Sequence, residues 1–400
     1  NPHRIINKNF HQPSVARQSG FYFIPSAVLE FETINTNFSI NLNDGKTDER
    51  ITNFDWLSRK YASYINRLPN TAKPEKEHKK RQNNLKSNMA NYLNLSRGLH
   101  IAESNICLTP SLEMCIYLVA QILLKPNDIV VVAELSYYIP NMIFTNQKAK
   151  ILTIPTDKDG ILVDALEDIL KNHSIRMLYL TPHHHYPTTV TLNAPRRVKL
   201  LELSRQYGFV ILEDDYDYEF HYDRYPLLPL ASADQNGMVI YVGSFAKSLL
   251  PSFTKGFIVA TEDFIREADK YVNLLYHDKD RYIESVLNEM IVEGDMHRFI
   301  KKNNKVYRER RNLCCQLLKD NLANDIDFIK PNGGLAVWLQ WKKQINLMKL
   351  KQNAQTYAMD IPTTILYQNK KTTAMRLGFG DCSEEEMFSI IDILKKSIPK

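Results

Sequence analysis

The chain has 400 residues, a formal net charge of +6 and a hydrophobic share of 44%. This length exceeds one typical domain and suits two or three, and the 17 Phe, 21 Tyr and 3 Trp support a sizeable core. No run approaches the roughly 18 apolar residues that a membrane span needs, and we expect no signal peptide. The mild positive charge permits a nucleic-acid partner without requiring one.

The five cysteines are odd in number and scattered, except for Cys314-Cys315. None has the spacing of metal ligands. This usage predicts reduced thiols and a cytoplasmic protein, because disulfides persist mainly in oxidising compartments.

The first 24 residues are predicted to form a hairpin and linker. The run from Val15 to Ile24 has Ser19-Gly20 at its centre and favours a tight hairpin. We expect residues 25–85 to join the smaller domain described below.

From about Asn105 onward, apolar runs of strand length alternate with helical patterns such as 112–124 and 196–207. The alternation predicts an α/β fold with a mostly parallel sheet flanked by helices. The predicted strands are 129–132, 151–154, 177–180, 209–212, 239–242 and 256–259.

After about Asp280 the pattern changes to long charged helices over 282–322, followed by strand-like runs at 333–339 and 364–366 and a final helix over 384–398. We therefore predict a large domain over 86–295 and a smaller α+β domain over 296–400.

Two segments of the large domain carry chemistry. Lys247 follows the apolar run 238–242 and a Gly243-Ser244 turn, and a lysine just beyond a buried strand can lose its proton and attack a carbonyl. Thirty-three residues upstream, Asp214 lies in a burst of carboxylates that ends the run 209–212. A Schiff-base lysine with a carboxylate for a pyridinium nitrogen is what pyridoxal phosphate requires.

Five stretches in this order resemble the fold-type-I aminotransferases. Within them, the chain is most similar to the aminotransferase-like domain of MocR-type regulators of the GntR superfamily. The stretches are Arg97-Gly98-Leu99, 212–220 (Leu-Glu-Asp-Asp-Tyr-Asp-Tyr-Glu-Phe), 244–252 (Ser-Phe-Ala-Lys-Ser-Leu-Leu-Pro-Ser), Pro331-Asn332-Gly333-Gly334-Leu335 and Met375-Arg376-Leu377-Gly378-Phe379.

The resemblance implies a pyridoxal phosphate cofactor and a role for each matching residue. Lys247 is expected to form the internal aldimine, and Asp214 to accept a hydrogen bond from the pyridine N–H. Tyr216 matches the tyrosine that bonds the cofactor's 3′ oxygen. Arg376 matches the arginine whose guanidinium holds the substrate's α-carboxylate.

The remaining cofactor contacts are also implied by the resemblance. An aromatic ring is expected to stack on the cofactor, and we assign it to Tyr138 with Tyr137 left open as the alternative. The other implied contacts are Ser111 and Leu112 at a helix start that suits a phosphate, His184, Ser244 and Lys255. We predict no metal, because three consecutive histidines at 183–185 cannot all face one ion.

The phosphate site departs from the family pattern. Glu113 places an anion where the family has an amide, and Thr254 stands where it has a phosphate-binding arginine, with Lys255 displaced by one position. Glycine positions of the family read Ser136 and Thr189 here. Loss of one charge-assisted contact weakens binding by roughly 1.5–3 kcal/mol, so we expect weaker cofactor binding than usual.

Three functions stay open. The first is an effector domain of a MocR-like regulator, in which an amino-acid-like compound forms an external aldimine and shifts DNA binding. The 15–24 run resembles the end of a winged helix-turn-helix wing, and DNA would be read only by a domain that the chain lacks. The second is a free-standing aminotransferase, and the third is a cofactor-free dimerisation scaffold. The resemblance also implies a homodimer, and no membrane partner is expected.

Overall fold

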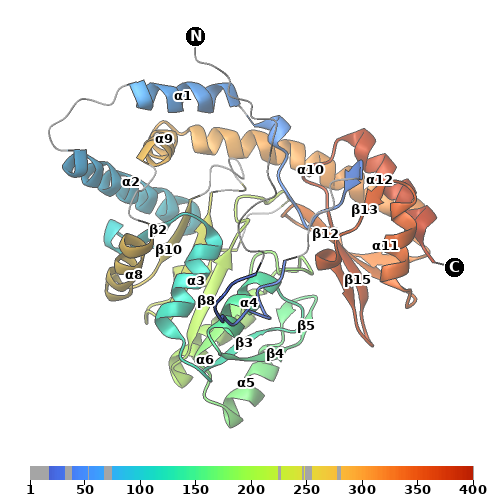
Figure 1. The fold of residues 1–400 in the computed structure, drawn as a ribbon, viewed down its shortest axis with the longest axis horizontal. Coiled ribbons are helices and arrows are strands. Elements are labelled where there is room, and N and C mark those ends of the chain that lie inside the picture. The colour runs from blue at the N-terminus through green and yellow to red at the C-terminus, as the bar shows by residue number, and fades with distance from the viewer. Residues whose placement is uncertain are drawn as a thin grey trace.

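The computed structural model describes residues 18–31, 38–52, 54–66, 74–223, 227–245, 247, 255–276 and 281–399. Two bodies lie side by side, and the long helix α10 (Asp295–Leu322) runs from the first into the second (Figure 1). The cavity described below lies where the two bodies meet.

The larger body is built on a seven-stranded sheet in the order β2-β10-β9-β8-β7-β3-β4. All neighbours pair in parallel except β10, which is antiparallel to both β2 and β9. The predicted α/β fold with a mostly parallel sheet is confirmed. The strands are β2 (Ile106–Thr109), β3 (Ile129–Ala133), β4 (Lys150–Ile154), β7 (Met177–Leu180), β8 (Val210–Asp215), β9 (Val239–Ser244) and β10 (Gly256–Val259).

Helices cover both faces of this sheet because its strands are apolar on both sides. Val130 and Val132 pack into one buried cluster with residues of three helices, whereas Val131 packs into another on the opposite face. The first face carries α3 (Leu112–Leu123), α4 (Tyr138–Asn146) and α8 (Glu262–Leu275), and the second carries α5 (Val163–Asn172) and α6 (Ala194–Tyr207). Short elements β5 (Thr156–Asp157), β6 (Gly160–Ile161) and α7 (Leu230–Ala233) complete this body.

The smaller body is an antiparallel sheet in the order β11-β12-β15-β14. Its core lies between this sheet and the C-terminal half of α10 with two further helices. Its elements are β11 (Ile326–Phe328), β12 (Ala336–Trp341), α11 (Leu347–Gln355), β13 (Met359–Asp360), β14 (Leu366–Gln368), β15 (Thr373–Gly378) and α12 (Glu384–Ser397).

The charged region 282–322 forms two helices. α9 (Arg281–Val292) ends just before Gly294, whose φ of 72° lies in the left-handed region that glycine tolerates, and α10 begins at the next residue. The glycine therefore separates the helix of the large body from the helix that enters the small one.

The N-terminal region divides between the two bodies. β1 (Ile40–Asn41) pairs in parallel with β13 of the small body. α1 (Phe54–Asn66) and α2 (Pro74–Arg97) pack instead against α9 above the large body (Figure 1). Within the described residues, the part around β1 thus joins the small body, whereas the prediction placed the whole of 25–85 there.

The predicted hairpin at the N-terminus is not found in its described part. Residues 18–24 form no strand, and residues 15–17 lie outside the described residues. Phe21, Tyr22 and Ile24 are all more than two-thirds exposed. An isolated two-stranded hairpin is only marginally stable in water, and these side chains have no sheet to pack against.

None of the helices in the described part of the chain is both long and apolar enough to cross a membrane. The five cysteines are buried and unbonded to one another.

Candidate active site

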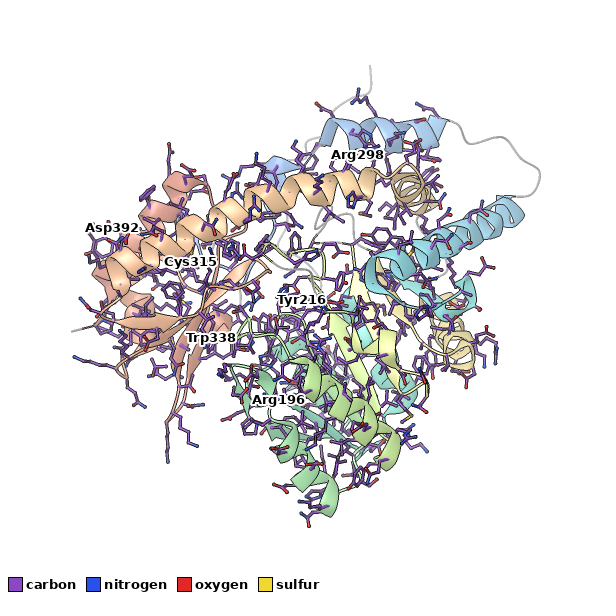
Figure 2. The ribbon with its side chains drawn as sticks, turned by 180° about the vertical axis from the view of Figure 1, so that it is seen from behind. Arg196, Tyr216, Arg298, Cys315, Trp338 and Asp392 are labelled. Atoms are coloured by element: carbon purple, nitrogen blue, oxygen red, sulfur yellow. The ribbon has the colours of Figure 1, made fainter. Side chains whose placement is uncertain are left out.

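A cavity of about 710 Å³ lies between the two bodies, at the carboxyl ends of the parallel strands. Tyr216, one of its lining residues, lies near the centre of the molecule between the two domains (Figure 2). The large body contributes Ser111, Leu112, Glu113, Tyr137, Thr181, Tyr186, Asp214, Tyr216, Ser244 and Lys247. The opposite wall consists of residues 44–50 with Asp381 and Glu386. Six of the ten predicted site residues therefore line one cavity.

Lys247 lies three residues beyond the end of β9, partly buried in this cavity. Its Nζ donates to the carbonyl oxygen of Gly45 at 3.3 Å and lies 4.6 Å from the centre of the Tyr216 ring. Burial lowers the pKa of Lys247, against the opposing effect of nearby carboxylates that include Asp44. The structure thus provides an amine that deprotonates more readily than a surface lysine.

The carboxylates at the end of β8 have different partners because strand residues alternate between faces. Glu213 accepts from the backbone N–H groups of Leu230 and Ala231, at the start of α7. Asp215 accepts from the Tyr241 hydroxyl at 2.6 Å. These two contacts are structural, and only Asp214 faces the cavity from this strand.

Asp214 is 2% exposed. The Tyr179 hydroxyl donates to its Oδ2 at 2.7 Å, and its Oδ1 has no hydrogen-bond partner within the part of the chain described. Burial raises the pKa of Asp214 to about 7; the nearby Glu113 adds to this effect, and Lys247 and the Tyr179 hydrogen bond oppose it. A buried acceptor without a donor is costly, so this oxygen suits the N–H of a protonated pyridine ring.

The raised pKa of Asp214 makes the stability of the cofactor-free protein depend on pH. Between the ordinary carboxyl pKa and about 7 the folded protein holds a proton that the unfolded chain releases, so stability falls as pH rises through this window. We expect Asp214→Asn to remove this loss. The free energy of unfolding of the variant should gain roughly 2–3 kcal/mol relative to the parent between pH 5 and pH 8.

Urea unfolding of both proteins at the two pH values measures this difference, since every other titrating group is common to both. An equal difference between parent and variant at pH 5 and pH 8 would mean that Asp214 ionises normally in the folded protein.

Arg376, on β15, lies beside the cavity without lining it and is 1% exposed. Its guanidinium donates to the backbone oxygens of Asp44 at 2.8 Å and Pro187 at 2.9 Å, and to the Tyr216 hydroxyl at 3.3 Å. The group also lies 4.6 Å from the Tyr186 ring. These bonds use three of the five N–H groups of an arginine, so donors for a carboxylate remain.

The start of α3 forms the end of the cavity where the phosphate was predicted. The Ser111 hydroxyl accepts from the N–H of Met114 at 3.2 Å and caps the helix, and Leu112 follows at its first turn. Such a helix start favours an anion. Glu113 also lines this end and opposes an anion there. The predicted departure at Thr254 lies outside the described residues.

Three of the predicted cofactor contacts lie elsewhere. Tyr137 lines the cavity, and Tyr138, the first residue of α4, packs edge-on against it, so the structure favours the alternative that the sequence left open. Lys255 is directed away from the lining, in a buried ion pair with Glu284 at 3.0 Å. Lys255 is displaced by one position from the family's phosphate-binding arginine, and a shift of one position along a strand turns the side chain to the opposite face. This is why its side chain is directed away from the cavity.

The three consecutive histidines have three different partners. His183 bonds the backbone oxygen of Leu227, His184 bonds Asp217 at 2.9 Å, and His185 bonds the Thr188 hydroxyl at 2.8 Å. The backbone oxygen of His184 accepts from the Tyr216 hydroxyl at 2.8 Å. The side chain of His184 thus does not line the cavity, although the residue positions one that does.

Sequence reasoning missed the wall formed by residues 44–50 and the Tyr179 partner of Asp214. Asn43-Asp44-Gly45 is a turn signal, but nothing local links it to a lysine two hundred residues later. Tyr179 lies in a predicted strand that pairs in parallel with the strand that contains Asp214. This parallel pairing was the clue by which the sequence could have identified Tyr179.

Known proteins match this chain over most of its length. The profile of the aminotransferase class I and II family matches residues 78–394, and the chain belongs to this family. The aromatic-amino-acid aminotransferase 1 of Thermococcus litoralis is 28% identical over 318 residues, which cover 78% of this chain and 76% of that protein.

Regulators are among the relatives as well. The uncharacterised HTH-type transcriptional regulator YdeL of Bacillus subtilis is 26% identical over 313 residues, 78% of this chain but only 66% of the regulator. Among solved structures, a Pyrococcus horikoshii kynurenine aminotransferase in complex with PMP superimposes with a TM-score of 0.82 at 22% identity, over 94% of this chain and 96% of that one. This last likeness concerns the fold.

Family membership implies pyridoxal phosphate as the cofactor. The residues present fit this group, because the orphaned Oδ1 of Asp214 and the Nζ of Lys247 face one cavity whose far end is a helix N-terminus. Glu113 is the single lining carboxylate that opposes the fit at the phosphate end.

Proposed function

We propose that this chain is the pyridoxal-phosphate-binding effector domain of a MocR-type transcriptional regulator and that it binds an amino-acid-like compound. When bound, pyridoxal phosphate supplies a carbonyl that condenses with amines and a ring that acts as an electron sink. Lys247 holds the cofactor and yields its place to the ligand's amine. Asp214 keeps the ring nitrogen protonated, and Arg376 binds the ligand's carboxylate.

The binding part of this proposal rests on one observation: Lys247 and Asp214 line the same cavity. Both side chains are held by neighbours: Lys247 by Gly45 and the Tyr216 ring, and Asp214 by Tyr179. Lys247 and Asp214 form no direct ion pair with each other in the described residues. An ion pair between them therefore does not explain why both side chains are held in one cavity.

The regulatory part of the proposal is supported by the relatives. YdeL is named as a helix-turn-helix regulator, and the aligned region spans only two thirds of it. The second candidate, a free-standing aminotransferase, is supported by the Thermococcus litoralis relative, of which the match covers 76%.

A comparison of ligand binding with turnover separates these candidates. The protein loaded with pyridoxal phosphate is mixed with amino acids, and the visible spectrum is recorded with and without a 2-oxo acid acceptor. An effector domain is expected to show a saturable spectral shift and to release less than one oxo-acid product per site. Many products per site would establish the aminotransferase, and no cofactor spectrum at all would leave the cofactor-free scaffold.

We also propose a homodimer in the cytoplasm. The family resemblance supports the dimer, and the buried free thiols support a reducing compartment. Sedimentation of the cofactor-loaded protein measures the first of these.

A further inference from the structure

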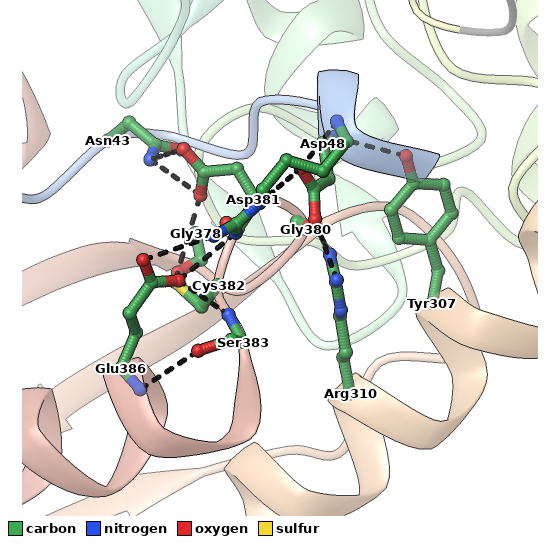
Figure 3. A network of polar contacts seen from close by, with 11 residues as sticks. Asn43, Asp48, Tyr307, Arg310, Gly378, Gly380, Asp381, Cys382, Ser383 and Glu386 are labelled. Atoms are coloured by element: carbon green, nitrogen blue, oxygen red, sulfur yellow. Dashed lines mark hydrogen bonds and ion pairs between the residues drawn. The ribbon is translucent and has the colours of Figure 1, made fainter. Parts of the chain in front are cut away.

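The wall opposite Lys247 begins with a short segment, Asn43 to Lys46, that the small body holds rigidly. The Asn43 side-chain oxygen accepts from the N–H groups of Gly45 and Lys46, and its amide donates to Asp381 at 2.9 Å (Figure 3). Gly45 has a φ of 112°, and a Cβ there would lie 3.2 Å from the backbone of Leu335. The backbone that carries the Asp44 side chain is therefore held in place by the small body.

This segment lies between the two cations that an amino acid would use. The backbone oxygen of Asp44 accepts from Arg376, and the backbone oxygen of the next residue, Gly45, accepts from Lys247. A ligand with its amine at Lys247 and its carboxylate at Arg376 must therefore lie alongside Asp44. The Asp44 carboxylate lines the cavity and accepts from the Tyr186 hydroxyl at 3.2 Å.

Three neighbouring carboxylates of this wall, those of Asp48, Asp381 and Glu386, are already bonded. Asp48 pairs with Arg50 and with Arg310 at 2.6 Å, and Glu386 pairs with Arg50 (Figure 3). Asp381 is held by the amide of Asn43 (Figure 3). Asp44 differs from them, because it forms no ion pair within the described part of the chain.

The two positive charges near Asp44 belong to Lys247 and Arg376, and both are engaged when the cofactor and a ligand are bound. The Asp44 carboxylate acts electrostatically on both Lys247 and Arg376. Lys247 is engaged once the cofactor is attached to it, and a bound carboxylate neutralises Arg376. A partly buried carboxylate whose cations are removed is left uncompensated, which is costly. A ligand that brings a second cation removes this cost.

We propose that Asp44 is a specificity-determining residue that selects amino acids with a second, cationic amine on the side chain and disfavours dicarboxylic ones. This inference rests on the proposed function of the same cavity. Lys46 and Arg50 also line the cavity, but both are exposed, and Arg50 already pairs with Asp48 and Glu386. A diamino acid thus has one amine for Lys247 and one for Asp44.

L-Ornithine and L-norleucine test this inference, because they differ only in a terminal ammonium in place of a methyl group. Both are titrated into the protein loaded with pyridoxal phosphate, and the spectral shift gives each Kd. We expect ornithine to bind about 10- to 100-fold more tightly, the range of a charge-assisted hydrogen bond. In Asp44→Asn this preference should fall to about unity, because the isosteric amide keeps the shape and loses the charge.

Glu385→Gln serves as the matched control, since it removes an exposed carboxylate of the small body that does not line the cavity. We expect it to retain the ornithine preference. The inference is overturned if the parent binds norleucine as tightly as ornithine, or if Glu385→Gln abolishes the preference as fully as Asp44→Asn. A protein whose spectrum neither amino acid changes would instead contradict the proposed function.

Discussion

Replacement of Lys247 by Ala is expected to abolish the visible absorbance band that the protein acquires with pyridoxal phosphate, together with its response to amino acids. Among the described residues, Lys247 is the lysine that both lines the cavity and is sheltered within it, over the Tyr216 ring and against Gly45. Loss of a covalent nucleophile typically lowers a reaction rate by on the order of 10³-fold or more. Absorbance titration with the cofactor measures the band directly.

Lys46→Ala is the matched control for this experiment. Lys46 lines the same cavity but is exposed at its edge. We expect this variant to keep both the band and the amino-acid response. A band that survives in Lys247→Ala and disappears in Lys46→Ala would move the covalent chemistry from β9 to the N-terminal segment.

The fold was predictable from sequence because its signals are local. Runs such as 129–132 and 177–180 are apolar on both faces, and a strand that is apolar on both faces belongs inside a layered sheet. The strand of the seven-stranded sheet that was missed, β2, has the short sequence Ile-Cys-Leu-Thr and closely precedes a helix. A run of that length cannot be told from the first turn of a buried helix by periodicity.

The side of the cavity that holds Lys247 and Asp214 was predictable from the sequence. Lys247 follows β9 and Asp214 lies near the end of the neighbouring β8, and the carboxyl ends of parallel strands meet at one edge. The wall that includes Asp44 was not predictable, because it is placed by contacts across more than three hundred residues, such as that between Asn43 and Asp381. No periodicity or propensity carries information over that separation.

Lys255 was assigned to the cofactor by the family resemblance, and in the structure it has a buried partner of its own. The sequence assigned it to the cofactor because it is basic and close to the expected arginine position. The structure gives it another role: it is 3% exposed, pairs with Glu284 on α9, and lies 5.6 Å from the Tyr276 ring. Its ammonium thus links β10 to a helix that covers the sheet.

The expected result of Lys255→Met is therefore a loss of stability. Removing one member of a buried ion pair leaves the other charge uncompensated and costs about 3–5 kcal/mol. Glu284 is itself buried, and its second oxygen has no hydrogen-bond partner within the described residues, which places this variant at the upper end of that range. The urea midpoint of the cofactor-free protein should fall accordingly.

The double variant Lys255→Met with Glu284→Met decides between the two roles of Lys255. A protein in which a buried ion pair is replaced by apolar side chains of similar volume is often as stable as the original. We therefore expect the double variant to recover most of the lost stability, so that its change in unfolding free energy differs from the sum of the two single changes. If Lys255 instead bound the cofactor's phosphate, its replacement would leave the cofactor-free protein stable and would weaken cofactor binding. A second change at Glu284 would not restore that binding. Unfolding and cofactor titration of the three variants therefore distinguish a lysine that supports the sheet from one that holds the phosphate.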